Sequence, residues 1–250
     1  MDLNKEIKAF WEGEAEIYSH GIQEELQGKQ RQAWKKLILE YAPKKEVLKI
    51  LDAGCGPGFF SVILGEEGHE VTGIDITENM IAEARENVRQ QGQKAALFTM
   101  DCQELEFQDD TFDLVICRNI TWTLDNPQKA YREWKRVLKP GGRMLVFDAC
   151  WYLHQYDNVL GEKFKKIEEQ VNEKYGKLET GHADPEKGDE LGSHAFLSDK
   201  RRPLWDLEYL MSIGFKKVFA EPDIMEKVYW SEREKELHQL TPGFLVGAEK

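Results

Sequence analysis

The chain has 250 residues, enough for one large α/β domain with an inserted cap but too few for two independent cores. Its 46 acidic residues outnumber 34 basic ones, giving a formal net charge of −12. Nucleic-acid-binding proteins gather Lys and Arg on one face, so this charge argues against nucleic acid as a partner.

The chain lacks sequence signals for membranes, secretion and disulfides. No apolar run approaches the roughly 20 residues that span a bilayer, and the first 20 residues are charged throughout. We therefore expect no membrane association, no signal peptide and a cytoplasmic location. The four cysteines are widely separated and form no CxxC pair, which predicts reduced thiols without a structural zinc site.

Alternating helices and apolar strands organise the first 150 residues. Apolar residues at three- and four-residue steps predict two amphipathic helices within residues 1–44, the second ended by Pro43. Strands are predicted at 47–54, 70–75, 95–100, 112–118 and 143–149, and helices at about 59–67, 80–91 and from Pro127 to the glycines at 141 and 142. This alternation indicates a mainly parallel sheet covered by helices on both faces.

The regular alternation ends after the fifth strand. A helical stripe is predicted at 160–175, and the Gly-, Asp- and His-rich stretch 176–195 is predicted as a mobile loop. A helix at 204–212 and strands at 215–221 and 243–249 close the chain. We expect lid helices in 1–44, a cofactor-binding core in 45–150, an inserted cap and loop in 151–203, and completion of the sheet in 204–250.

A glycine-rich loop follows the first predicted strand. Gly54, Gly56 and Gly58 lie between a buried strand and a helix, where backbone N–H groups can approach a ligand closely. The dinucleotide fingerprint requires a small residue where this chain has Phe59, which disfavours a nicotinamide-dependent oxidoreductase. Asp75 and Asp101 end the next two strands, so both carboxylates are expected at the same edge of the sheet as the loop.

Five segments carry this pattern in order: "ILDAGCGPGFFS", "VTGIDITENMI", "MDCQELEF", "FDLVICRN" and "REWKRVLKPGGRMLVFD". Together they resemble the class I S-adenosylmethionine-dependent methyltransferases, in particular the group similar to quinone-biosynthesis methyltransferases. The resemblance covers residues 45–149 and, more loosely, the N-terminal helix and the last two strands. It implies a Rossmann-like, seven-stranded, mostly parallel sheet with an N-terminal helical lid and a helical cap inserted after the fifth strand. The five segments are not specific to an acceptor, but the acidic composition and the small cap predict a small-molecule methyl acceptor and leave a protein substrate open.

The resemblance also implies how S-adenosylmethionine would be bound. The three glycines would face its methionine part, with Asp52 holding the loop or the amino group. Asp75 would hold the ribose hydroxyls. The remaining cofactor-binding residues would be Ile76, Met80, Asp101 and Cys102 around the adenine, Arg118 and Asn119 beside the transferable methyl, and Tyr18 in the lid.

Methyl transfer is an in-line displacement that depends on positioning the acceptor and excluding water. Aromatic side chains suit such a cavity, and Trp122, Trp151, Tyr152 and Phe196 are candidates for its wall. His154 is the first candidate for a general base, because histidine titrates near neutral pH. Asn119 is a second catalytic candidate, since it would border the transferable methyl. His182 and His194 are further candidates for binding the acceptor.

Other interpretations stay open at this point. His182, Asp184 and His194 are irregularly spaced for a metal site, and we expect no metal. Arsenic methyltransferases resemble this superfamily and use several cysteines, but only Cys150 is placed to face an acceptor. A nicotinamide-dependent oxidoreductase and a non-catalytic cofactor-binding module are the alternatives from other classes. The sequence leaves monomer and homodimer equally open.

Overall fold

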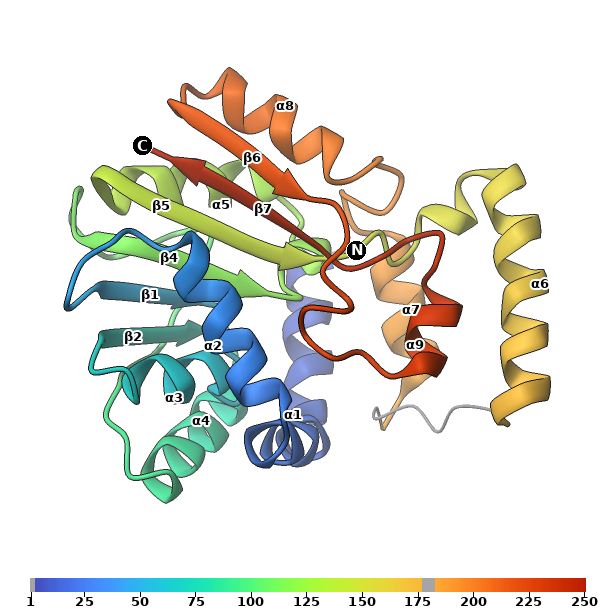
Figure 1. Ribbon diagram of the computed structural model, residues 1–250, viewed down its shortest axis with the longest axis horizontal. Helices are drawn as coiled ribbons and strands as arrows, with labels where there is room; N and C mark the ends of the chain where they lie inside the picture. Colours follow the sequence, from blue (N-terminus) through green and yellow to red (C-terminus); the bar gives the residue numbers. More distant parts are fainter. Residues whose placement is uncertain (1–2, 177–182) are drawn as a thin grey trace.

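The computed structural model describes residues 3–176 and 183–250 (Figure 1). Its centre is a seven-stranded sheet in the order β3-β2-β1-β4-β5-β7-β6, in which β7 is antiparallel to both β5 and β6. The strands are β1 Lys49–Ala53, β2 Glu70–Asp75, β3 Ala96–Thr99, β4 Phe112–Arg118, β5 Leu138–Asp148, β6 Lys217–Glu221 and β7 Phe244–Glu249. The predicted mostly parallel α/β sheet is confirmed.

The strands form because both of their faces are buried. In β4, Leu114 and Ile116 pack into the hydrophobic cluster on one face of the sheet, and Val115 and Cys117 pack into the cluster on the other face. β5 begins at Leu138, five residues before the predicted start, because it already pairs with Phe112 before a register shift in the ladder.

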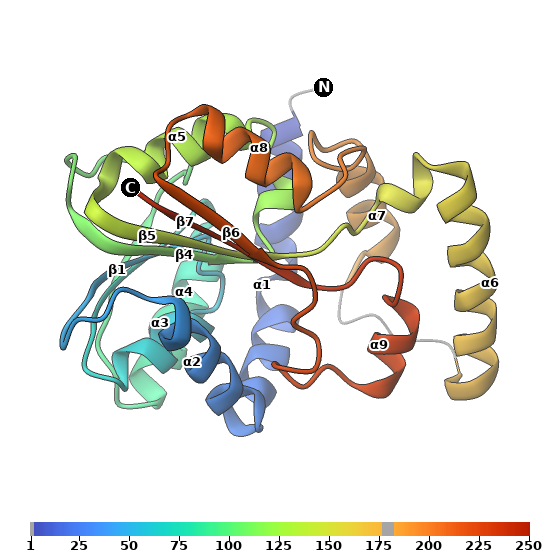
Figure 2. The ribbon, with the colours of Figure 1, turned by 45° about the horizontal axis from the view of Figure 1, so that its top comes forward.

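Helices cover both faces of the sheet. α2 Gln30–Tyr41, α3 Phe59–Gly65 and α4 Glu78–Gln90 lie on one face, and α5 Pro127–Val137 and α8 Leu204–Ser212 lie on the other (Figure 2). Trp34 packs edge-on against Phe60 and Phe147 in the first layer. Trp134 is fully buried in the second layer.

The remaining helices gather beyond the carboxyl ends of the parallel strands (Figure 1). They are η1 Thr121–Thr123, η2 Leu153–Gln155, α6 Asn158–Tyr175, α7 Pro185–Ser193 and α9 Glu232–Leu237. The prediction of a loop throughout 176–195 is wrong for α7. Asp184 caps this helix by accepting a hydrogen bond from Lys187 N, and Pro185 occupies its first turn.

Helix α1, Leu3–Gln27, lies between the sheet and α7 (Figure 2). The carboxylate of Glu12 accepts hydrogen bonds from the backbone N–H groups that open α4, at 2.9 and 3.0 Å. The buried carboxylate of Glu14 accepts from the backbone N–H groups of Ala183 and Asp184, at 2.9 and 3.0 Å, where α7 begins. One helix therefore connects the core to the cap through two helix N-termini.

None of the described helices is long and apolar enough to cross a bilayer.

Candidate functional site

The loop between β1 and α3 is built on left-handed backbone. Gly54 and Gly56 have φ values of +69° and +50°. A Cβ on Gly54 would lie 2.6 Å from Ile120 Cγ1, and one on Gly56 would face Tyr18 at 3.8 Å. Gly58 also has positive φ, but a Cβ there would meet Ala84 at 3.2 Å, so it serves the packing of α3 on α4.

Asp75, the last residue of β2, ties the loop to the next turn. Its Oδ2 accepts a hydrogen bond from Gly56 N at 3.0 Å. Its Oδ1 accepts from Thr77 N and Thr77 Oγ1 at 3.0 and 2.9 Å. Burial raises the pKa of this carboxyl, and the hydrogen bonds from Thr77 and Gly56 oppose the rise. The carboxylate is thus oriented before any ligand binds.

Asp101 follows β3 and is held in a similar way. Its Oδ1 accepts from Gln103 N at 2.8 Å, and its Oδ2 accepts from Asn4 Nδ2 of α1 at 3.3 Å. The side-chain carbonyl of Gln103 in turn accepts from Asn126 N at 2.9 Å, just before α5. The acid therefore faces α1 with a fixed orientation.

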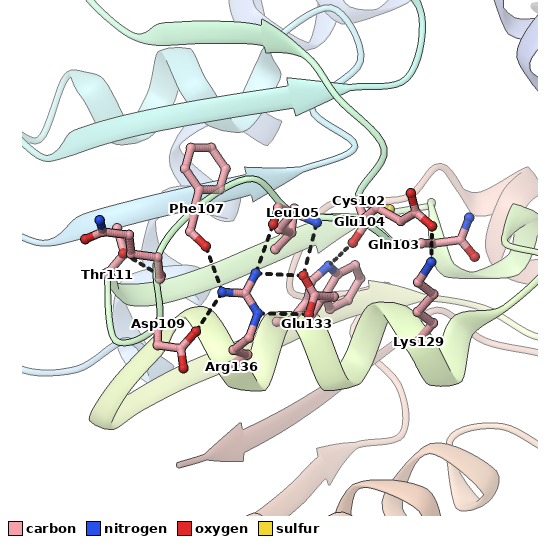
Figure 3. Close-up of polar contacts among 12 residues, drawn as sticks. Cys102, Gln103, Glu104, Leu105, Phe107, Asp109, Thr111, Lys129, Glu133 and Arg136 are labelled. Carbon is pink, nitrogen blue, oxygen red and sulfur yellow. Dashed lines mark hydrogen bonds and ion pairs between the residues drawn. The ribbon is translucent and has the colours of Figure 1, made fainter.

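Helix α5 holds the segment that carries Cys102 and Gln103 (Figure 3). Arg136 Nη2 donates to the carbonyl of Leu105 at 2.9 Å, and Glu133 accepts from Leu105 N at 3.1 Å. Trp134 Nε1 donates to the carbonyl of Cys102 at 3.0 Å. The buried face of one helix thereby positions a loop that has no regular structure of its own.

These groups surround a cavity, which we call the glycine-loop cavity. The predicted residues in its wall are Tyr18, Gly54, Gly56, Asp75, Ile76, Met80, Asp101, Cys102, Arg118 and Asn119. The sequence did not point to Asn4 and Ile7 of α1 or to Gln103 after β3, which also line it, because isolated polar and apolar residues carry no ligand signal.

Asp52 lies beneath the glycine loop rather than in that cavity. It accepts a hydrogen bond from Ser61 Oγ at 2.8 Å and lines a smaller adjoining cavity with Arg118. Burial raises the pKa of Asp52 to about 7, while Ser61 and Arg118 act in the opposite direction. Arg118 itself donates to Glu25 at 2.6 Å and places its guanidinium 4.6 Å from the centre of the Phe59 ring.

Asn119 lies where the glycine-loop cavity meets a second cavity. Its φ is +55°, which is uncommon for a residue other than glycine, and its N–H donates to the Phe147 carbonyl at 2.9 Å. Its side chain hydrogen-bonds to Tyr18, whose pKa is raised by burial. Trp11, Tyr18 and Asn119 line both cavities and so form the boundary between them.

The second cavity is here called the aromatic cavity. Of the predicted acceptor residues, Trp122, Trp151, Tyr152 and His154 line it. The Trp122 ring lies 5.5 Å from Tyr152 and 6.4 Å from Trp11, measured between ring centroids. The cavity is thus walled by rings from α1, η1 and the segment after β5.

The imidazole of His154 stacks on Phe164 with ring centroids 4.1 Å apart, and burial lowers its pKa. Phe10, Asp189 and His238 line the same cavity without having been predicted. His238 comes from the segment between β6 and β7, packs 5.4 Å from Trp151 and has a pKa lowered to about 4 by burial. No local pattern in the sequence connects it to this place.

Other predicted residues lie elsewhere. His194 is exposed, with Nδ1 2.7 Å from the Glu190 carbonyl, and Phe196 packs edge-on against Trp205 at 5.5 Å. Neither lines the aromatic cavity, and His182 lies outside the described residues. Cys150 Sγ lies 3.2 Å from the Arg202 carbonyl and also does not line it. In residues 3–176 and 183–250, no group of three His, Cys, Asp or Glu side chains could hold a metal.

Part of this chain is similar in sequence to known methyltransferases. Residues 51–146 match the methyltransferase domain family. A malonyl-[acyl-carrier protein] O-methyltransferase of Erwinia pyrifoliae is 41% identical over 118 residues, which are 46% of this chain and 42% of that protein. A ubiquinone/menaquinone biosynthesis C-methyltransferase of Vibrio vulnificus is 33% identical over 121 residues, 46% of each chain.

A solved structure extends the likeness in fold. A phosphoethanolamine N-methyltransferase of Haemonchus contortus, in complex with phosphomonomethylethanolamine and S-adenosylhomocysteine, aligns with a TM-score of 0.66. It is 17% identical and covers 98% of this chain and 60% of its own. The chain spans less than half the length of the curated relatives named above. Residues 51–146 therefore form a methyltransferase domain, and the sheet around them has the fold of a solved methyltransferase.

Proposed function

We propose that the protein transfers a methyl group from S-adenosylmethionine to a small molecule. The observation that carries this proposal is the pair of adjoining cavities, which share Trp11, Tyr18 and Asn119 as their boundary. Donor and acceptor held on the two sides of that boundary would meet in one place. Most of the catalytic effect would come from this positioning.

The glycine-loop cavity fits the donor. Bound there, S-adenosylmethionine would supply an electrophilic methyl group on a sulfonium sulfur. Asp75 would accept from the ribose hydroxyls and Asp101 from the adenine amino group, since both carboxylates already face the cavity. Ile76 and Met80 would pack on the adenine, next to the backbone of Cys102. These residue roles are proposals.

The other end of that cavity suits the methionine part. Backbone at Gly54 and Gly56 would lie against it, because both glycines line the cavity and have no side chain of their own. Asp52 would act from below, next to Arg118 in the smaller adjoining cavity. Tyr18 would keep water out of the boundary between the two cavities. Exclusion of water favours the displacement, because the sulfonium loses its charge during the reaction.

The aromatic cavity would take the acceptor between Trp122, Trp151 and Tyr152. His154 would accept a proton from the acceptor, because its lowered pKa leaves the imidazole neutral at pH 7. Asn119 would orient the reacting atom through its side-chain amide. His194 and Phe196 do not line this cavity and have no role in the proposed site.

The charges of the aromatic cavity favour an acceptor without a phosphate group. Among residues 3–176 and 183–250, its wall contains one Lys or Arg, Lys165, against the carboxylates of Glu168 and Asp189. Phosphate sites normally combine Arg side chains or helix N-termini that point at the anion. The Haemonchus protein was solved with a phosphorylated amine, so this chain would differ from it in substrate.

Neither alternative has comparable support. A nicotinamide-dependent oxidoreductase needs a small residue where Phe59 is buried against Phe60. A non-catalytic module needs no space for an acceptor, yet a large cavity adjoins the donor position.

The first test is donor binding by isothermal titration calorimetry with S-adenosylhomocysteine. We expect Asp75→Ala to weaken binding between about ten- and a hundredfold, because hydrogen bonds to a charged group are lost. Asp199→Ala removes an exposed acid that lines neither cavity and should leave the affinity unchanged. Equal affinities of the Asp75 variant and the parent protein would contradict the assigned donor site.

The second test is activity. S-adenosylmethionine carrying a labelled methyl group is incubated with the protein and a fractionated cell extract, and the labelled product is identified. S-adenosylhomocysteine should raise the melting temperature and NADH should not. A rise with NADH alone would favour the oxidoreductase, and donor binding without label transfer in any fraction would favour the non-catalytic module.

A further inference from the structure

Asp148, the last residue of β5, has both carboxylate oxygens occupied and a fully buried side chain. Its Oδ1 accepts from Ala149 N at 2.9 Å and from Trp151 Nε1 at 2.8 Å. Its Oδ2 accepts from Trp122 N at 3.2 Å and also from the Thr121 hydroxyl. One carboxylate therefore binds segments that follow two different strands, β4 and β5.

Those segments carry two walls of the aromatic cavity. The Trp122 ring contacts the rings of Trp11 and Tyr152, and Trp151 stacks on Trp230 with ring centroids 6.2 Å apart. The indole N–H of Trp151 donates to Asp148, and η1 is bonded to the same carboxylate through the Trp122 N–H and the Thr121 hydroxyl. The position of both rings thus depends on where this carboxylate lies.

A second layer holds the carboxylate in turn. Arg202 Nη1 donates to Asp148 Oδ2 at 2.9 Å, and its Nε and Nη2 form a fork on Asp206 at 2.9 and 2.8 Å. Tyr131 Oη donates to Asp206 Oδ1 at 2.5 Å. Arg202 and both acids are buried, and the planar guanidinium imposes a fixed geometry on the two carboxylates it joins.

Stability alone is a weak explanation for this arrangement. A buried ion pair contributes little compared with apolar residues of the same volume, because removing charges from water is costly. The ion pair has a larger effect on geometry than on stability, since it fixes hydrogen-bond donors and acceptors relative to one another. Neither Asp148 nor its partners Arg202 and Asp206 line the glycine-loop cavity.

We propose that Asp148 is a positioning residue for the acceptor, which holds Trp122 and Trp151 in place and is itself oriented by Arg202, Asp206 and Tyr131. This inference rests on the proposed function, because it assigns the aromatic cavity to the acceptor. Acceptor recognition then depends on Tyr131 of α5 and Asp206 of α8, whose side chains do not line the glycine-loop cavity.

The test uses Asp148→Asn, Asp206→Asn and Tyr131→Phe in the full chain. Tyr41→Phe is the matched control, because Tyr41 Oη also donates to a carboxylate at 2.5 Å, that of Glu221, and lines neither cavity. Each protein is labelled with 5-fluorotryptophan, and the fluorine resonances of Trp122 and Trp151 are assigned by single Trp→Phe substitutions. Donor affinity is measured by calorimetry with S-adenosylhomocysteine.

We expect the resonances of Trp122 and Trp151 to shift or broaden in the three network variants and to stay unchanged in Tyr41→Phe. The dissociation constant of S-adenosylhomocysteine should stay within about twofold of the parent value. With the active extract fraction as acceptor source, the fraction needed for half-maximal labelling should rise between about ten- and a hundredfold for Asp148→Asn, because misplaced walls misplace the acceptor.

The experiment distinguishes a failure of this inference from a failure of the proposed function. Tyr131→Phe removes a single hydroxyl and keeps the inference testable even where Asp148→Asn does not fold. Unchanged Trp122 and Trp151 resonances in the folded variants would overturn the inference, as would a donor affinity that falls in parallel with labelling. If the parent protein labels no fraction, the proposed function fails, and the fluorine spectra still decide whether Asp148 positions the two tryptophans.

Discussion

Asn119 shows how one strained residue can define a site. A left-handed backbone conformation is unfavourable in free energy for any residue that has a side chain, whereas glycine adopts it freely. Residues other than glycine keep this conformation only where their surroundings impose it. Here the hydrogen bond from Asn119 N to Phe147 and the side-chain contact with Tyr18 impose it. The strain lies where the two cavities meet, so the amide is presented to both.

Gly54 is the residue at which a side chain should be tolerated least. Gly54→Ala places a Cβ 2.6 Å from Ile120 and requires a left-handed alanine, so we expect a loss of roughly 2 to 3 kcal/mol in the free energy of unfolding. Gly21→Ala, with no atom within 4 Å and a helical position, should instead stabilise by about 0.5 to 1 kcal/mol. Urea denaturation of both variants checks this, and equal effects would be contrary to the loop geometry.

The raised pKa of Asp52 predicts a pH dependence of stability. The folded protein holds the proton up to about pH 7, whereas the unfolded chain releases it near the ordinary value, so this acid's contribution to stability falls as pH rises between about 4 and 7. Asp52→Asn does not ionise. The difference in the free energy of unfolding, Asp52→Asn minus the parent protein, should therefore increase by roughly 3 kcal/mol from pH 4.5 to 7.5.

Urea unfolding of the two proteins across this pH range measures that difference. Glu16→Gln, at an exposed position on α1, controls for the removal of an acid without burial. A difference that does not change with pH would mean that Asp52 ionises normally in the folded protein.

At the scale of elements, α1 supports two other helices instead of forming an independent lid. Glu12 accepts from the first backbone N–H groups of α4, and Glu14 accepts from those of Ala183 and Asp184, which immediately precede α7. These groups have no partner within their own helices, and acids near a helix N-terminus also interact favourably with its dipole. The same helix contributes Trp11 and Tyr18 to the boundary between the cavities.

Glu14→Gln should therefore loosen α7. The substitution removes the charge and turns one acceptor into an amide donor that faces the N–H groups of Ala183 and Asp184. We expect faster amide hydrogen exchange in residues 185–193 and a loss of about 1 to 3 kcal/mol in unfolding free energy. Glu16→Gln should leave exchange in α7 unchanged, and the same rate of exchange in both variants would show that Glu14 does not hold this helix.

At the scale of the whole molecule, the site forms where segments distant in sequence converge. The carboxyl ends of β1, β2, β3 and β4 supply the glycine loop, Asp75, Asp101 and Asn119. The antiparallel β7 completes the sheet beside β5, and the segment before it brings His238 to the aromatic cavity. The crevice at the ends of parallel strands is the usual ligand site of open α/β sheets.

Donor binding should thus be detected across α1. Asn4, Ile7, Trp11 and Tyr18 of α1 line the glycine-loop cavity, so saturating S-adenosylhomocysteine should slow amide exchange in residues 4–18 by holding the helix against the core. Helix α8 packs with α5 on the face of the sheet opposite to α2, α3 and α4, and its amide exchange rate should not change. Protection that is equal in α1 and α8 would indicate general stabilisation instead of contacts with the donor.

Much of the glycine-loop cavity could be predicted from the sequence because its residues lie within local motifs. Strands β2 and β4 and helix α8 have the predicted bounds, since apolar runs between turn residues mark buried elements directly. Asp75 and Asp101 could be located because acids that follow parallel strands lie at one edge by topology alone. Helices α7 and α9 were missed despite the Asp-Pro start of one and the Ser231–Glu234 capping box of the other.

The aromatic cavity depended on tertiary structure, because its residues come from segments whose proximity no local pattern encodes. His238 reaches Trp151 only through the antiparallel return of β7, and His194 and Phe196 point elsewhere although they lie in the predicted cap. The sequence by itself determined the sheet and the donor loop, since hydrophobic periodicity and glycine spacing are local properties. Which rings form the second wall was decided by packing, because burial is a property of the folded chain.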